Sequence, residues 1–253
     1  MLKGKKIVVA GSGGLLGSQT VKQLLLQNAN VLAVDNNYQG MIDRLVNQDI
    51  DISHSQLTLM PLDLTNEQEV TGFFNDVTDL DGAVNCTYPR NKNYGRDFLE
   101  VKLNDFNENV NLHLGAAFLF TQQCAAYFLR EKKWFSLVNI ASIYGVIAPK
   151  FTIYEHTPMT MPVEYAAIKS AIIHLNKYVA SYVANSNFRI NSVSPGGIFD
   201  NQPSSFLEAY KKNSLGRGML DVNEVTGAIL FLLSDFSKYI NGQNLIVDDG
   251  FSL

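Results

Sequence analysis

The chain has few of the residues that build disulfide frameworks and metal clusters. Its 253 residues include only two cysteines, Cys86 and Cys124, and four histidines. Two cysteines far apart in sequence do not make the disulfide framework of a small secreted domain, so we expect reduced thiols in a cytoplasmic protein. The histidines lack the spacing of metal ligands, and no metal site is expected.

Charge and long apolar runs are also scarce. Charged residues make up 17% of the chain, and 20 Lys+Arg against 24 Asp+Glu give a net charge of -4. Without an excess of positive charge, general binding to nucleic acid or to an acidic membrane is not expected. Apolar runs such as residues 228–233 fall far short of the roughly 20 residues that a membrane-spanning helix needs. The low charge instead favours a surface partly covered in a homo-oligomer.

Short apolar runs alternate with helical periods along the whole chain. The unbroken apolar character of most runs is typical of strands buried on both faces of a sheet. We predict strands over residues 6–10, 30–34, 56–60, 82–85, 136–140, 189–193 and 245–247, and helices over 15–27, 66–75, 105–130, 163–184 and 222–233. The alternation predicts one Rossmann-like α/β domain over residues 1–253, with a doubly wound parallel sheet of about seven strands and helices on both faces.

A glycine-rich turn follows the first predicted strand. Gly11 permits a tight turn, Gly14 allows the backbone to approach a pyrophosphate, and Gly17 lets the next helix pack against the strand, with Leu15 and Leu16 between them. The start of that helix favours an anion. A plain glycine-rich turn is the competing interpretation, but the place between a strand and an amphipathic helix predicts a dinucleotide site.

Carboxylates follow the next two predicted strands. Asp35 ends the second strand, where its carboxylate would accept hydrogen bonds from both ribose hydroxyls and repel a 2′-phosphate, so NAD(H) is predicted over NADP(H). A role in the turn alone is the alternative for Asp35. Asp63 follows the third strand, where it either accepts from the adenine amino group or caps the helix that begins near Asn66.

A phenol and an ammonium lie on one face of the most regular predicted helix. Tyr165 and Lys169 stand one turn apart there, and a nearby cation lowers the pKa of a phenol so that it can take a proton from an alcohol. An ordinary surface pair is the alternative. Tyr88 and Lys92 have the same spacing, but a proline between them argues against a helix. Ser142, at the end of the fifth strand, would hydrogen-bond the reacting oxygen.

Together these features resemble the short-chain dehydrogenase/reductase family over essentially the whole chain. The matching residues are the glycine segment 11–17, Asp35, Asp63, Leu64, Asn85, Ser142, Tyr165, Lys169, the segment 194–197 and the segment 241–250. The resemblance implies hydride transfer between a nicotinamide and a carbinol or carbonyl carbon, in a homodimer or homotetramer. It makes Tyr165 the acid/base, Ser142 the residue that orients the substrate oxygen, and Lys169 the residue that binds the nicotinamide ribose.

The resemblance also implies which residues contact the cofactor. They are Gly11, Gly14, Leu15, Leu16, Gly17, Asp35, Asp63, Leu64, Asn85, Lys169, Pro195, Gly196 and Ile198. The family has an alanine and a glycine where Cys86 and Thr87 follow Asn85, which changes the wall beside the cofactor. The family's fourth catalytic residue, an asparagine, corresponds to His113 by an ungapped count and to Asn111 if a bulge is allowed. We expect Asn111, with His113 as a proton relay or an ordinary buried histidine as the alternatives.

Three segments are expected beside the substrate: residues 87–98, 145–162 and 197–220, the last a candidate lid. Basic residues there either grip an anionic sugar phosphate or nucleotide, or are solvated loop charges. They are Arg90, Lys92, Arg96, Lys150, Lys211, Lys212 and Arg217. Whole strings of the chain are similar to a flagellin-modification and surface-polysaccharide oxidoreductase subgroup, which implies a sugar derivative as substrate. An epimerase or dehydratase with tightly bound NAD, and a non-catalytic dinucleotide-binding regulator, are the alternatives.

Overall fold

The computed structural model describes all of residues 1–253, and seven parallel strands form one sheet. The strands are β1 (Lys6–Ala10), β2 (Asn30–Asp35), β3 (Leu57–Pro61), β4 (Gly82–Asn85), β5 (Phe135–Ile140), β6 (Phe188–Pro195) and β7 (Asn244–Val247). Their order is β3-β2-β1-β4-β5-β6-β7, so the direction of winding reverses between β1 and β4. The predicted doubly wound sheet is confirmed, and the place of reversal is where such sheets open a crevice.

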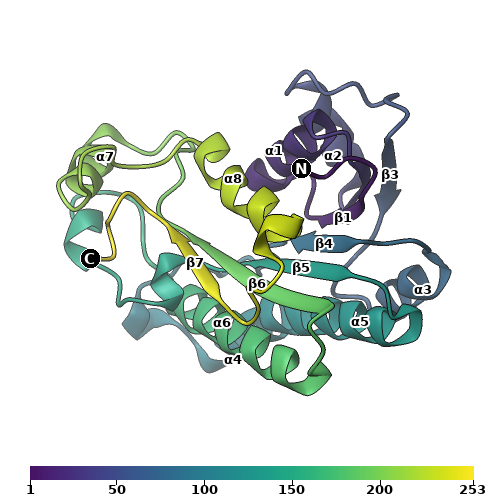
Figure 1. Ribbon diagram of the computed structural model, residues 1–253. Coiled ribbons are helices and arrows are strands. Elements are labelled where there is room, and N and C mark those ends of the chain that lie inside the picture. Colours follow the sequence, from purple (N-terminus) through teal and green to yellow (C-terminus); the bar gives the residue numbers. More distant parts are fainter.

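Helices cover both faces of the sheet (Figure 1). Those on one face are α1 (Leu15–Leu26), α2 (Tyr38–Val46) and α8 (Val222–Leu233), and those on the other are α3 (Glu67–Asp76), α4 (Leu103–Asn109), α5 (Ala116–Glu131) and α6 (Val163–Val183). Alternate residues of the central strands enter two separate hydrophobic cores: Val9 and Val84 pack with α1 and α8, whereas Val8 and Ala83 pack with α3 and α5. This two-sided burial explains the unbroken apolar strands.

Two short helices were not predicted from the sequence, and one predicted helix is divided. Helices α2 and α7 (Ser204–Lys211) have nine and eight residues, so each spans little more than two turns, too few for a helical period to stand out in the sequence. The predicted helix 105–130 consists of α4, a π-helical turn at Val110–Gly115 and α5. The wider turn changes which side chains face α6, a change that the 3.6-residue period does not reveal. None of the helices combines the length and hydropathy needed to cross a membrane.

Candidate active site

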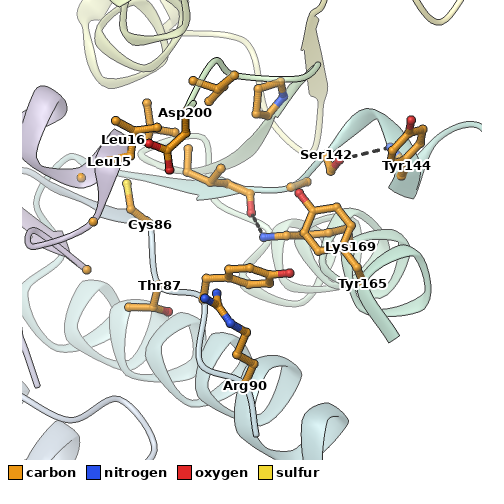
Figure 2. Close-up of a pocket in the computed structure, with 18 of the residues that line it drawn as sticks. Leu15, Leu16, Cys86, Thr87, Arg90, Ser142, Tyr144, Tyr165, Lys169 and Asp200 are labelled. Carbon is orange, nitrogen blue, oxygen red and sulfur yellow. Dashed lines mark hydrogen bonds between the residues drawn. The ribbon is translucent and has the colours of Figure 1, made fainter. Parts of the chain in front are cut away.

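A cavity of about 1000 Å³ opens along the carboxyl edge of the sheet. One end is lined by the turns after β1, β2 and β3, and the other by the loop after β4, the segment between β5 and α6, and the segment between β6 and α8. Figure 2 shows side chains from both ends converging on Lys169. Residues from all three segments expected beside the substrate line this cavity, although those segments are distant in sequence.

The glycine turn leaves no room for side chains. Gly11 has a φ of +77°, and a Cβ there would lie 2.9 Å from the backbone carbon of Cys86. A Cβ on Gly17 would lie 2.0 Å from the carbonyl oxygen of Gly11, so α1 packs directly against the turn. Gly14 is the N-cap of α1 and makes no side-chain cap. Together with the start of α1, this turn fits the diphosphate of a dinucleotide.

Asp35 is held in place at the end of β2. Its Oδ2 accepts from the backbone N–H of Gly13 at 2.9 Å, and its Oδ1 accepts from that of Asn37 at 2.9 Å. The carboxylate therefore braces the glycine turn and still lines the cavity. This placement fits a ribose that binds beside a carboxylate.

Asp63 lines the cavity beyond β3, but it does not cap α3. Its Oδ1 accepts from the N–H of Thr65 at 2.9 Å and from the Thr65 hydroxyl at 2.7 Å. The N-cap is Asn66, whose side chain accepts from the N–H groups of Gln68 and Glu69. The alternative in which Asp63 caps this helix is therefore wrong.

Of the other predicted cofactor residues, Asn85 alone lies outside the cavity. It is buried, and its Oδ1 accepts from the backbone N–H of Thr87 at 3.1 Å and from the Thr87 hydroxyl at 2.7 Å. Asn85 thus shapes the turn after β4 and presents Cys86 and Thr87 to the cavity in its place. The predicted residues that line the cavity are Gly11, Gly14, Leu15, Leu16, Gly17, Asp35, Asp63, Leu64, Lys169, Pro195, Gly196 and Ile198.

Ser142, Tyr165 and Lys169 meet in the cavity (Figure 2). Tyr165 lies in the first turn of α6, and Lys169 follows one turn later on the same face. The Lys169 Nζ donates to the carbonyl oxygen of Ile140 at 2.7 Å and lies 5.6 Å from the centroid of the Tyr165 ring. The Ser142 Oγ accepts from the N–H of Tyr144 at 3.2 Å, which fixes the serine at the end of β5.

Burial dominates the ionisation of this cluster. It lowers the pKa of Lys169 to about 7, an effect that the Cys86 thiol partly opposes, and it raises the pKa of Tyr165, an effect that the Ser142 hydroxyl partly opposes. We expected the ammonium to lower the pKa of the phenol, but in this structure the Tyr165 pKa moves the other way. The physical reason is burial, which takes the phenol out of water and disfavours its charged form.

The structure places His113, and not Asn111, behind the reactive cluster. Asn111 is exposed and lies outside the cavity. The His113 side chain is buried, its ring centroid lies 5.1 Å from that of Tyr88, and neither ring nitrogen has a hydrogen-bond partner. Burial lowers the pKa of His113 to about 2, helped by the charges of Lys169 and Arg90, so the imidazole is neutral. The preference for Asn111 is corrected, because the π-helical turn rotates that side chain outward.

The substrate end of the cavity is lined by aromatic and methionine side chains. They are Tyr88, Tyr94, Tyr144, Tyr154, Phe206, Tyr210, Met159, Met161 and Met219. The Tyr154 hydroxyl donates to that of Tyr144 at 3.2 Å, and the Tyr210 hydroxyl accepts from the N–H of Gly197 at 2.6 Å. Burial raises the pKa of all five phenols in this set, so they remain protonated donors near neutral pH.

Phe251 joins the segments around the substrate end. Its ring is fully buried and stacks on Tyr210 at a centroid distance of 4.3 Å. The Lys150 Nζ donates to the Phe251 carbonyl at 2.9 Å and lies 4.4 Å above the ring. The neighbouring Asp249 carboxylate accepts from the N–H groups of residues 216–218. Residues after β7 therefore hold the candidate lid and the 145–162 segment together.

Sequence reasoning placed Tyr88 in a segment beside the substrate but assigned it no role of its own in the site. It dismissed Tyr88 with Lys92 as a pair of coincidental spacing, yet the Tyr88 ring lies edge-on to that of Tyr165 at 5.5 Å between centroids, and the Lys169 Nζ lies 5.8 Å from the Tyr88 centroid. The available signal was position: Tyr88 follows β4, which ends at the crevice. Residues 88–92 form no helix and Lys92 does not line the cavity, so the rejection of Tyr88 and Lys92 as a helical phenol–ammonium pair is confirmed.

Comparisons with known proteins agree with this geometry. The sequence model of a family described as enoyl-(acyl carrier protein) reductase matches residues 11–252. Post-translational flagellin modification protein A of Campylobacter coli is 36% identical over an alignment that covers 100% of both chains. The 3-oxoacyl-(acyl-carrier-protein) reductase FabG of Thermotoga maritima is 28% identical over 98% of both.

A solved structure is similar in both sequence and fold. It is a short-chain dehydrogenase from Leptospira borgpetersenii with bound NAD+, with a TM-score of 0.87 and 30% identity, and the match covers 100% of this chain and 94% of that one.

Proposed function

Because the chain belongs to the short-chain dehydrogenase/reductase family, we propose that it is an NAD(H)-dependent oxidoreductase acting on a carbinol or keto carbon of a sugar derivative. The observation that carries the proposal is the meeting of Ser142, Tyr165 and Lys169 in a cavity that continues to the glycine turn and Asp35. A nicotinamide cofactor supplies the hydride acceptor or donor.

The three side chains have distinct tasks in this proposal. Ser142 donates a hydrogen bond to the substrate oxygen and holds it beside the Tyr165 hydroxyl. Tyr165 takes the hydroxyl proton during oxidation and returns it during reduction. The phenolate of the buried Tyr165 needs a cation to stabilise it, and the Lys169 ammonium, 5.6 Å from the centroid of the Tyr165 ring, supplies that charge. We assign the fourth position to His113, whose unpartnered ring nitrogens lie behind Tyr88.

The proposed preference for NAD(H) rests on Asp35. Its carboxylate lines the cavity, and the residues that follow, Asn36 and Asn37, supply no positive charge for a 2′-phosphate. The proposed sugar-type substrate, within surface-glycan or flagellin modification, is supported by the name of the Campylobacter coli relative and by the phenols at the substrate end. Aromatic faces and hydroxyl donors suit a polyhydroxylated ring.

A homodimer or homotetramer is also part of the proposal. It is supported by large aromatic side chains that α6 leaves exposed: Tyr178 and Tyr182 are 65% and 70% exposed and stack on each other.

The test follows NADH absorbance while phosphorylated and nucleotide-linked amino sugars are offered with NAD+. We expect Tyr165→Phe to lower kcat by about 10²- to 10⁴-fold on any substrate found, the usual contribution of general acid–base catalysis. Tyr239→Phe is the matched control and should match the wild type, because Tyr239 is 84% exposed and lies outside the cavity. An unchanged kcat in Tyr165→Phe would refute the acid/base role.

The same assay separates the alternatives. NAD that stays bound through purification, with substrate converted and no net NADH formed, would favour an epimerase or dehydratase. Binding of NADH with no turnover of any compound would favour a non-catalytic regulator.

A further inference from the structure

We propose that Arg90 binds an anionic group of the substrate, a phosphate or a carboxylate, beside the reacting carbon. The inference rests on the proposed function and narrows its substrate class. It starts from Arg90, a solvent-exposed cation on the cavity wall, which an uncharged sugar would leave in contact with water alone.

Arg90 points from the loop after β4 toward the reactive cluster (Figure 2). Its guanidinium carbon lies 4.9 Å from the centroid of the Tyr88 ring, and Tyr88 in turn contacts Tyr165. A ring beneath the guanidinium fixes its plane and leaves its N–H edge free. The Tyr88 hydroxyl is itself hydrogen-bonded to Tyr94 within the same loop, so this platform is held from two sides.

No group of the chain neutralises Arg90. It makes no hydrogen bond and no ion pair, and apart from Lys169 it is the one lysine or arginine that lines the cavity. A guanidinium with this freedom matches the two oxygens of a carboxylate or phosphate in a bidentate pair.

The other basic residues expected near the substrate form ion pairs or hydrogen bonds within the chain, or lie outside the cavity. Arg96 pairs with Asp105 at 3.6 Å, and Arg217 pairs with Glu224 at 3.2 Å. Lys150 is bound to the carbonyl of Phe251. Those that are exposed outside the cavity are Lys92, Lys211 and Lys212. Of the basic residues that the sequence offered for binding an anionic substrate, only Arg90 is therefore available in the cavity.

The carboxylates of the cavity leave the space around Arg90 free for an anion. Asp35 and Asp63 line the dinucleotide end, and Asp200 lies on the opposite side of the cavity from Arg90 (Figure 2). Two other anions compete with a substrate for this guanidinium: the diphosphate of the cofactor, and Asp200 itself if the lid closes. The experiment must distinguish all three.

The experiment compares matched sugars on the NAD-loaded enzyme: D-glucosamine against D-glucosamine 6-phosphate, D-glucose 1-phosphate against D-glucose, and D-glucuronate against D-glucose. Equilibrium binding to the enzyme–NADH complex and NAD+ reduction are both measured for the wild type, Arg90→Gln, Arg90→Lys and Asp200→Asn. Lys92→Gln in the same loop is the matched control. NADH and ADP-ribose affinities are measured separately.

We expect an anionic member to bind more tightly than its neutral partner. Arg90→Gln should raise its Kd and KM by about 10- to 100-fold at nearly constant kcat, with partial recovery in Arg90→Lys and no effect of Lys92→Gln. NADH and ADP-ribose affinities should stay unchanged, which separates a substrate subsite from loss of structure.

Three results would overturn the inference. A tenfold loss of ADP-ribose affinity in Arg90→Gln would assign the residue to the cofactor diphosphate, and an equal effect of Asp200→Asn would assign it to a lid contact. The inference would also be refuted if a neutral sugar bound tightly and was oxidised equally well without Arg90, or if no anionic probe bound. In the neutral-sugar case Tyr165→Phe would still abolish turnover, so the proposed function would stand while this inference fails.

Discussion

The two ends of the cavity are built in different ways. At the dinucleotide end the backbone forms the wall: the turn after β1 packs against itself, and a Cβ on Gly17 would lie 2.0 Å from the Gly11 carbonyl oxygen. At the substrate end, side chains from segments far apart in sequence touch one another, as Phe251 does with Tyr210 and Lys150. A backbone wall tolerates no added atom, whereas a side-chain wall can change its shape by substitution.

This difference predicts where changes separate cofactor binding from substrate binding. Substitutions in the backbone wall should weaken dinucleotide binding and destabilise the fold together, because α1 and the turn share the same contacts. Substitutions in the side-chain wall should weaken substrate binding while the dinucleotide still binds.

The largest effect is expected at Gly17. In Gly17→Ala the added methyl collides with the backbone of the turn, so we expect a loss of at least about 4 kcal/mol in the free energy of unfolding together with loss of NADH binding. Chemical denaturation and NADH fluorescence titration measure the two. The control is Gly227→Ala in α8, where a Cβ meets nothing within 4 Å, and which should stabilise by up to about 1 kcal/mol. Normal NADH binding by Gly17→Ala would contradict the rigidity of this wall.

Phe251→Ala tests the opposite wall. Deleting a fully buried phenyl ring should cost about 3 kcal/mol, and the loss should concentrate around the candidate lid. We expect faster trypsin cleavage at the exposed Lys211, Lys212 and Arg217, with NADH affinity little changed. Phe236→Ala is the control, since that ring is 74% exposed. If cleavage sites in α1 and α2 open equally fast, the two ends are not separable.

The third prediction concerns cofactor choice. Asp35→Asn removes the negative charge but keeps an oxygen for the N–H of Gly13 or Asn37. The ratio of NADPH to NADH affinity should rise by about 10- to 100-fold, which corresponds to about 1.4–2.7 kcal/mol. Parallel titrations with both cofactors measure this ratio. Asp43→Asn, exposed on α2 and outside the cavity, should leave it unchanged. A wild-type protein that already prefers NADPH would refute the role of Asp35.

The fourth prediction concerns the slope of stability with pH. The folded pKa of Lys169 is about 7 and its ordinary value is 10.5, so between these values unfolding takes up a proton and the free energy of unfolding rises with pH. The slope from this residue approaches about 1.4 kcal/mol per pH unit. Above about pH 9 the trend should reverse, because the buried thiols of Cys86 and Cys124 keep their protons in the folded state when the unfolded thiols lose them. The Tyr165 phenol adds to this reversal above pH 10.

Denaturation between pH 6 and 10 measures this slope. Lys169→Met should flatten it, and Lys177→Met, exposed on the same helix, should not. An unchanged slope in Lys169→Met would show that the buried ammonium does not control it.

The sequence predicted the parts of the site whose residues are neighbours in the chain. The seven strands follow from unbroken apolar runs, and Gly11 to Gly17 follow from their place between a strand and a helix. The prediction of Tyr165 and Lys169 needed both the helical period and the resemblance to the family. The prediction of Asn111 was wrong because a π-helical turn breaks that period, and Asn85 was misplaced because its side chain turns inward to shape a loop.

The amino-acid sequence by itself determined a parallel sheet, a glycine turn between a strand and a helix, and a phenol one helical turn from an ammonium, since each depends on local spacing and on which residues avoid water. Only the tertiary structure decided that Arg90 is left without a partner while Arg96, Lys150 and Arg217 are engaged, and that Tyr88 and His113 lie beside Lys169. The physical reason is that the pairing of a charge, and its removal from water, depend on atoms brought together from distant parts of the chain.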